Sequence, residues 1–143
     1  RIDLHVPVPE LDETLMQRSS TNTESDPRDL QRMREIVSRA QDQQRNRHGC
    51  LNANLSGEAL ARRISEADLA PAFLADVCKK MELSMRSYHK IWRVALTIAD
   101  LDHADVPSVP DERTNQPSPP ADITQQHFIE ALSYRTMTCG GEG

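Results

Sequence analysis

Aromatic residues are scarce in this chain. It has two Phe, two Tyr and one Trp among 143 residues, so aromatic side chains make up 3 % of the sequence. A hydrophobic core must therefore depend mainly on aliphatic side chains, which each bury less surface than an aromatic ring. Because parts of the chain also lack any packing pattern, about a hundred residues remain to form one domain, and we expect that domain to be only marginally stable.

Paired cysteines and long apolar runs are also missing. The three cysteines are an odd number, and none belongs to a Cys-x-x-Cys pair. No histidine lies at metal-ligand spacing from any of them. Neither a disulfide framework nor a metal site is predicted. No apolar run approaches the roughly 18 residues that span a bilayer, and no signal peptide opens the chain, so we expect a cytoplasmic protein without membrane contact. The chain begins without Met, within an apparent strand, which predicts a piece of a longer protein.

A phosphate-binding loop is the third absence. ATPases of the P-loop type wrap backbone amides around the phosphates and place a lysine on the terminal ones, with the pattern G-x-x-x-x-G-K-[ST]. None of the five glycines of this chain forms that pattern, and no strand ends in acidic residues that could hold Mg²⁺. The fragment is therefore predicted neither to bind ATP tightly nor to hydrolyse it unaided, and it is predicted to have no cofactor of its own.

Hydrophobic spacing predicts helices over most of residues 26–135. The first has Asp26 as its N-cap, Pro27 at its first position and Gly49 as its stop. Its predicted inner face is Leu30, Met33, Val37, Ala40 and Gln44. A hydrophobic residue followed by a capping residue or proline marks four further starts, at Leu55-Ser56, Leu69-Ala70-Pro71, Leu83-Ser84 and Ile123-Thr124. The predicted fold is an all-α, compact helical bundle whose short connections favour antiparallel neighbours.

The remaining segments have other patterns. Residues 2–8 alternate between apolar and other side chains, which predicts a strand, and residues 1–25 as a whole are predicted to be the end of a preceding domain followed by a disordered linker. Residues 102–121 contain five of the nine prolines, so a mobile loop is predicted there within the domain 26–135. Residues 136–143 are predicted to be a flexible tail.

The helix predicted from Ser84 combines a buried stripe with an arginine in its first turn. The stripe follows helical spacing and consists of Tyr88, Ile91, Val94, Ala95, Ile98 and Leu101. Arg86 would lie near the positive end of the helix dipole, where a cation is locally unfavourable and a bound anion would offset the misfit. The alternative is an arginine that is simply solvated. Trp92, on the same helix, is predicted to be core or interface rather than a stacking platform for a base.

Residues of this helix resemble a family signature. The matching residues are Ser84, Arg86, Tyr88, His89, Arg93, Val94, Thr97, Ile98, Ala99, Asp100 and Leu101. Three more segments fall in the same order along the chain: RIDLHV at 1–6 resembles the end of that family's ATPase core, QRNRHGCLNAN at 44–54 its "Q-x-R…LNA" segment, and EALSYR at 130–135 its closing "EA-x-x-YR". The chain is identified by this resemblance as the C-terminal lid of a magnesium-chelatase-like bacterial AAA+ protein of the YifB/ComM type.

The resemblance implies roles for three arginines. Arg86 occupies the place of the second sensor arginine, which reaches from the lid to the γ-phosphate of ATP. Arg1 stands where related proteins have an arginine thought to act in trans, as a finger on the neighbouring subunit's nucleotide. Arg93 is a weaker candidate for nucleotide contact, with a structural ion pair as its alternative. Leu96 departs from the family, in which an arginine is common at that position.

The resemblance also implies the wider function. ATP and Mg²⁺ would bind only to the full-length parent, an ATPase that assembles as a ring homo-oligomer, expected to be a hexamer, in which the lid contacts its own core and the neighbouring subunits. In the YifB/ComM branch the implied substrate is DNA, during recombination and natural transformation. In the true chelatases the implied reaction is insertion of magnesium into a porphyrin. Residues 51–53 and 134–135 favour the DNA branch.

Two functions of other kinds remain open. One is a helical adaptor that binds proteins without nucleotide contact, which Leu96 and the 102–121 insertion favour. The other is direct DNA binding by residues 28–48, which contain six arginines against three acidic residues. The simpler interpretation of that helix is a solvated surface on which opposite charges pair at three- and four-residue spacing. The net charge of −5 argues against nucleic-acid binding over the whole surface.

Overall fold

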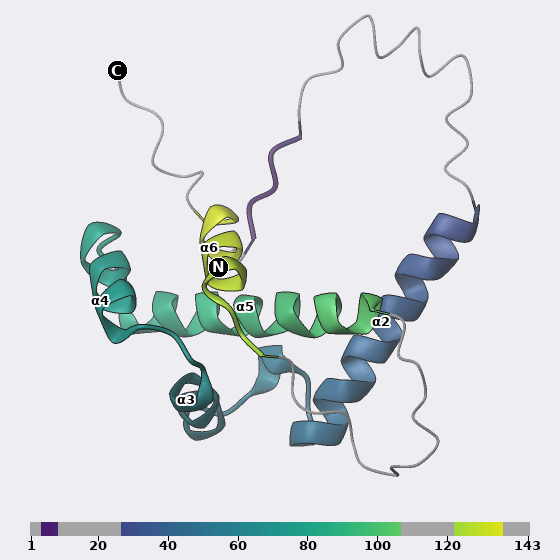
Figure 1. Ribbon diagram of the computed structural model, residues 1–143, viewed down its shortest axis with the longest axis horizontal. Coiled ribbons are helices and arrows are strands. Elements are labelled where there is room, and N and C mark those ends of the chain that lie inside the picture. The colour runs from purple at the N-terminus through teal and green to yellow at the C-terminus, as the bar shows by residue number, and fades with distance from the viewer. Residues whose placement is uncertain (1–3, 9–26, 107–121, 136–143) are drawn as a thin grey trace, which may run out of the picture.

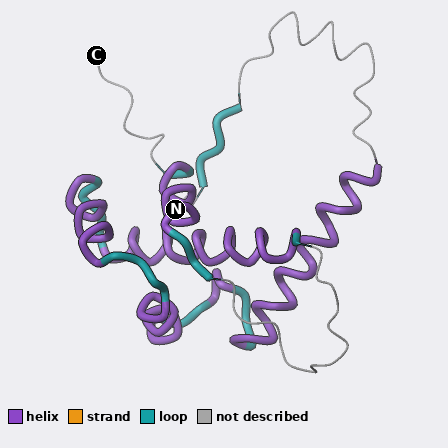
Figure 2. Tube along the Cα trace, viewed as in Figure 1, coloured by secondary structure: helices purple, strands orange, loops and turns teal. Residues whose placement is uncertain are grey.

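Helices make up most of the chain that the structure describes. A computed structural model describes residues 4–8, 27–106 and 122–135, and in these ranges it contains helices and loops but no strand (Figure 2). The elements are α2 (Pro27–His48), the 3-10 turn η1 (Asn52–Asn54), α3 (Gly57–Glu66), α4 (Pro71–Lys80), α5 (Met85–Asp105) and α6 (Gln125–Ser133). The predicted all-α class is confirmed.

Three helix starts are capped by the residues that the sequence predicts. The side-chain oxygen of Ser56 accepts the Ala59 N–H, and that of Ser84 accepts the Ser87 N–H, at 3.2 and 3.3 Å. Thr124 forms a capping box with His127 at the start of α6. Each cap pairs a backbone donor that would otherwise lack a partner in the first turn, which is why these helices begin where they do.

Helix α5 is the central element of the bundle. It contacts α2, η1, α3 and α6, and Figure 1 shows the other helices running across it rather than along it. The short connections therefore produce a compact bundle as predicted, but not the expected antiparallel alignment. Because partners surround α5, its buried residues occupy most of its circumference, not only the predicted stripe. They include Trp92, Leu96 and Asp100.

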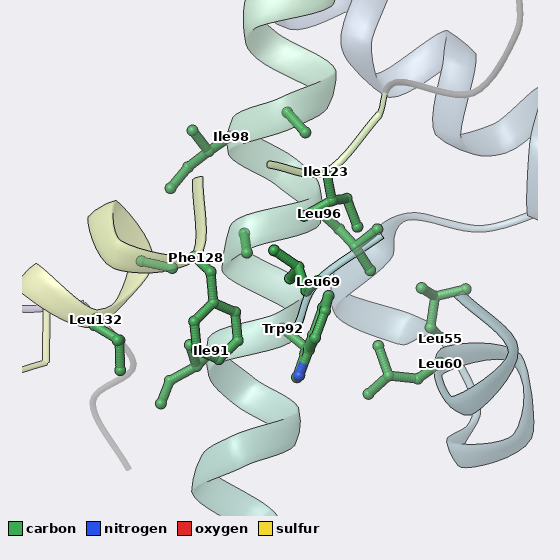
Figure 3. Close-up of a cluster of buried hydrophobic side chains, with 13 residues drawn as sticks. Leu55, Leu60, Leu69, Ile91, Trp92, Leu96, Ile98, Ile123, Phe128 and Leu132 are labelled. Carbon is green, nitrogen blue, oxygen red and sulfur yellow. The ribbon is translucent and has the colours of Figure 1, made fainter. Parts of the chain in front are cut away.

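The core gathers most of the few aromatic rings around α5. Four of the five Phe, Tyr and Trp rings form one connected cluster in which each contacts at least one other, and the closest centroids, those of Trp92 and Phe128, are 5.0 Å apart. Trp92 is fully buried, which confirms the core interpretation. Aliphatic side chains complete the cluster (Figure 3): Leu55, Leu60, Leu69, Ile91, Leu96, Ile98, Ile123 and Leu132.

The predicted inner face of α2 is wrong in its N-terminal half. Ala40 and Gln44 are buried as predicted, but Leu30, Met33 and Val37 are exposed. Figure 1 shows the reason: α2 crosses the C-terminal end of α5, and its N-terminal half extends beyond that crossing. Helical spacing identifies which face is apolar, but it does not reveal how far the partner helix extends.

Two element boundaries also differ from the predictions. Residues 4–8 are not a strand, because no neighbouring strand lies beside them in the described ranges; instead the His5 N–H donates to the Tyr134 carbonyl at 2.8 Å. Helix α5 continues to Asp105, four residues into the segment predicted as a loop, and an ion pair of 2.8 Å joins Arg32 to Asp105 in its last turn. The rest of the predicted linker, loop and tail lies outside the described residues.

Candidate functional site

Arg86 lies where the sequence predicts it, in the first turn of α5. Its side chain is exposed, and within the described part of the chain it makes no ion pair or side-chain hydrogen bond. It lines a groove of about 760 Å³ between α5, α6, η1 and residue 4. The other lining residues are Leu4, Ala53, Lys90, Arg93, Val94, Thr97, Ile98, Leu101, Asp102, Glu130 and Tyr134.

The N-terminal half of α5 gives the groove a positively charged end. Arg86, Lys90 and Arg93 are spaced at i, i+4 and i+7, so all three lie along one face of the helix over a rise of about 10 Å. The positive end of the helix dipole lies at the same end. An anion in this part of the groove would meet several cationic donors at once.

Arg93 has a structural contact that is not the predicted ion pair. Its Nη2 donates to the Leu55 carbonyl at 3.0 Å, and the Thr97 hydroxyl donates to the Arg93 carbonyl at 2.8 Å. Leu55 directly precedes the cap of α3, so this bond ties the start of α3 to α5. Arg93 therefore positions a neighbouring element while its side chain lines the groove.

A buried polar network contacts the lining of the groove at Thr97. The carboxylate of Asp100, which is 1 % exposed, accepts bonds from Arg47 Nη2 and Asn52 Nδ2, each at 2.8 Å. Gln44 Oε1 accepts the Asn52 backbone N–H at 3.0 Å, and Asn52 Nδ2 also reaches the Thr97 hydroxyl at 3.3 Å. The network joins α2, η1 and α5, and it therefore fixes the position of η1. Ala53 of η1 lines the groove.

The comparisons with known proteins decide the family. The profile described as "Magnesium chelatase, subunit ChlI C-terminal" matches residues 27–111, more than half of the chain. This chain belongs to that family. It is therefore a lid domain of the magnesium-chelatase-like AAA+ type. Its helices agree with the compact all-α lid that the resemblance implied.

Curated relatives agree with this assignment. The chain is 31 % identical over 137 residues to the competence protein ComM of Haemophilus influenzae, and 27 % identical to the uncharacterized YifB proteins of Salmonella typhimurium and Escherichia coli. Each alignment covers 96 % of this chain and 23 % of the relative. The chain thus spans about a quarter of the length of these relatives. No solved structure matches it significantly.

The motifs that suggested the magnesium chelatase family are mostly structural in this lid. Gln44 and Asn52 of the "Q-x-R…LNA" segment and Asp100 of the α5 signature meet in the buried network. The sequence alone did not place them together, because residues 44, 52 and 100 belong to three different elements. The sequence signal that could have identified them as buried is that Gln44 and Asp100 are polar side chains within apolar helical patterns.

The remaining site predictions have different outcomes. Arg1, the predicted finger, lies outside the described residues. Leu96 is buried, 1 % exposed, so its aliphatic side chain is part of the core. No cluster of metal-ligating side chains occurs in the ranges that the structure describes, and no helix there is long and apolar enough to cross a membrane.

The arginines of α2 are largely paired. Arg32 bonds Asp105, Arg45 bonds Asp42, and Arg47 bonds the buried Asp100. Three of the six arginines that suggested DNA binding are thus partly neutralised by carboxylates. The pair of Arg45 and Asp42, three residues apart, is of the kind that the solvated-surface interpretation predicts.

His48, beside the network, predicts a pH dependence of stability. Burial, followed by the neighbouring Arg47 and Arg63, lowers the pKa of His48 below its ordinary value of 6.5, although Asp100 and Glu66 oppose the shift. The unfolded chain therefore binds a proton before the folded chain does as the pH falls. We expect stability to be unaffected by this residue above pH 6.5 and to decrease as the pH falls below that value.

Urea unfolding measured between about pH 7 and pH 5 checks this expectation. His48→Gln should reduce the pH dependence of the unfolding midpoint relative to the parent chain, whereas His89→Gln serves as a control on another helix. An identical slope with pH in the parent chain and in the His48 variant would show that another group is responsible.

Proposed function

We propose that this lid senses ATP bound to the AAA+ core of the full-length protein, with Arg86 as the residue that contacts the γ-phosphate. The observation that supports this most directly is the position of Arg86: it is exposed at the positive end of α5, in a groove that also has Lys90 and Arg93 on its wall. A guanidinium suits the task because it is always charged and can donate two parallel bonds to phosphate oxygens.

The central place of α5 gives this contact a mechanical consequence. Four elements pack against α5, so a phosphate that draws Arg86 towards the core would move the lid as one body. Hydrolysis removes that phosphate and with it the bond. The lid angle would then follow the nucleotide state, which is how ATP hydrolysis would be coupled to remodelling.

Substitution of Arg86 in the full-length protein tests the proposal. Charge-assisted hydrogen bonds are worth about 1.5 to 3 kcal/mol, so Arg86→Ala should slow ATP hydrolysis by roughly 10- to 150-fold. Arg86→Lys keeps the charge without the bidentate geometry, so its rate of hydrolysis should lie between those of the parent protein and of Arg86→Ala. Steady-state ATPase assays measure the rates, and size-exclusion chromatography checks that assembly is retained.

Arg62→Ala is the matched control. Arg62 is also an exposed helical arginine, but it lies on α3, and its ion pair with Glu58 is an exposed contact of 3.9 Å. The control should hydrolyse ATP like the parent protein. Wild-type turnover in the Arg86→Ala variant would remove Arg86 from the mechanism.

The full-length protein is proposed to act as a ring homo-oligomer, a hexamer, that binds ATP with Mg²⁺ and uses Arg1 in trans. Remodelling of DNA in recombination and natural transformation is the proposed activity, which the 31 % identity to a protein named for competence supports. Stimulation of the ATPase by DNA rather than by a porphyrin would distinguish this from the chelatase branch. A Walker A motif upstream of Arg1 is required, and its absence would favour the adaptor.

A further inference from the structure

Residues 4–8 are fixed to the helical bundle at one point. Figure 1 shows this segment running out from α6 without coiling. The His5 N–H donates to the Tyr134 carbonyl at 2.8 Å. Tyr134 is the C-cap residue of α6, so its carbonyl has no amide of that helix as a partner. A segment from the other end of the described chain therefore completes the end of α6.

The two edges of this segment differ. In an extended chain, the N–H groups of alternate residues point to opposite sides. One edge carries the His5 amide, and the next residue on that edge is Pro7, which has no N–H and cannot extend a ladder. The other edge carries the amides of Leu4, Val6 and Val8, and none of these donates a backbone hydrogen bond within the described ranges. Only this second edge is open to a further strand.

The open edge belongs to a segment whose apolar side chains are exposed. Leu4, Val6 and Val8 are 49, 65 and 86 % exposed, and their spacing of two residues places them on one face of an extended chain. Exposed apolar side chains beside unpaired backbone groups favour pairing with another strand. The alignments cover only 23 % of each curated relative, so a full-length protein of that size has ample chain to supply the strand.

We propose that residues 4–8 are the joint between this lid and the AAA+ core of the full-length protein. A strand of the core pairs with the open edge at Leu4 and Val6, while the opposite edge stays bonded to α6 through His5. The end of α6 is then fixed to the core, and the lid turns about that point, as hinges at the ends of elements do. This inference rests on the proposed function, because it names the point about which the lid angle changes.

The joint lies on the wall of the groove that contains Arg86. Leu4 and Tyr134 both line that groove. Arg86 lies on α5, and α5 packs against α6, so a turn about the end of α6 moves Arg86 relative to the core. The bond between His5 and Tyr134 thus sets the orientation of the lid without contacting the nucleotide, which makes His5 a positioning residue.

Hydrogen exchange tests the joint without any substitution. In this chain, NMR should show the His5 amide exchanging about two- to tenfold more slowly than the Val6 amide after correction for intrinsic rates, which corresponds to the net strength of one hydrogen bond. In the full-length protein, mass spectrometry should show slower exchange of the peptide with residues 4–8 than in this chain, because the open edge is paired. Equal exchange of the His5 and Val6 amides, or no added protection in the full-length protein, would overturn the inference.

Substitution of His5 in the full-length protein tests its positioning role. His5→Pro removes the N–H donor, whereas the matched control His5→Ala removes the imidazole and keeps the donor. His5→Pro should lower kcat for ATP hydrolysis by about two- to tenfold and leave the KM for ATP nearly unchanged, since the orientation of the lid is lost and no nucleotide contact is removed. His5→Ala should hydrolyse ATP like the parent protein.

The outcomes separate this inference from the proposed function. A parent-like kcat in His5→Pro, or an equal loss in both His5 variants, would show that the backbone bond does not position the lid. Normal hydrolysis by Arg86→Ala would instead overturn the proposed function. Exchange of the His5 amide does not depend on Arg86, so the two failures are distinct.

Discussion

Replacing Trp92 with alanine is expected to lower the free energy of unfolding of this chain by about 3 to 5 kcal/mol. Trp92 is fully buried, and its ring lies 5.0 Å from that of Phe128 and 6.1 Å from that of Tyr88. In a core with so few rings, no neighbour is large enough to fill the cavity. Since a domain of this size has only about 5 to 15 kcal/mol of stability, the loss would be a large share of the total.

Urea denaturation followed by circular dichroism measures this effect, because the substitution removes the chain's only tryptophan and with it the usual fluorescence signal. Trp92→Phe should cost less, since a ring remains to contact Phe128. Met33→Ala should cost no more than about 0.5 kcal/mol, because Met33 is 62 % exposed. An unchanged midpoint for Trp92→Ala would mean that the aromatic cluster does not hold the bundle together.

Replacing Asp100 with alanine is expected to destabilise the chain by a similar amount, about 3 to 5 kcal/mol, for a different reason. The substitution leaves the Arg47 guanidinium partly buried without its carboxylate, and it also removes the acceptor of Asn52 Nδ2. The loss therefore includes the cost of an unpaired charge in addition to two hydrogen bonds. The turn η1 should loosen as a result.

The exposed ion pair between Glu58 and Arg62 provides the comparison. Glu58→Ala should change the free energy of unfolding by less than about 1 kcal/mol, because both partners are well solvated. The double variant Arg47→Met/Asp100→Leu should recover part of the stability, since it removes both charges together. If Asp100→Ala proved no worse than Glu58→Ala, the network would have no structural role.

Local interactions explain why so much of the helix pattern could be predicted. Ser56, Ser84 and Thr124 were recognised as caps because a cap needs only its own side chain and the next few backbone amides. The same reasoning placed Pro27 at the start of α2 and Arg86 in the first turn of α5. All of these features depend on residues within one helical turn.

Long-range contacts account for what could not be predicted. The exposure of Leu30, Met33 and Val37 depends on where α2 crosses α5, and the last turn of α5 is supported by Arg32, 73 residues away in sequence. A local sequence pattern does not reveal contacts between residues so far apart in the chain. The lining of the groove likewise includes both Asp102 and Glu130, which come from different helices.

The amino-acid sequence by itself determined the helices, their starts, the family and the helix on which Arg86 lies, because spacing and capping act between residues a few positions apart. The tertiary structure decided which apolar faces are covered, that Asp100, Arg47 and Asn52 form one buried network, and that the cationic and acidic residues line a single groove. Those properties arise only when elements distant in sequence pack against α5, since burial and charge pairing depend on position in space.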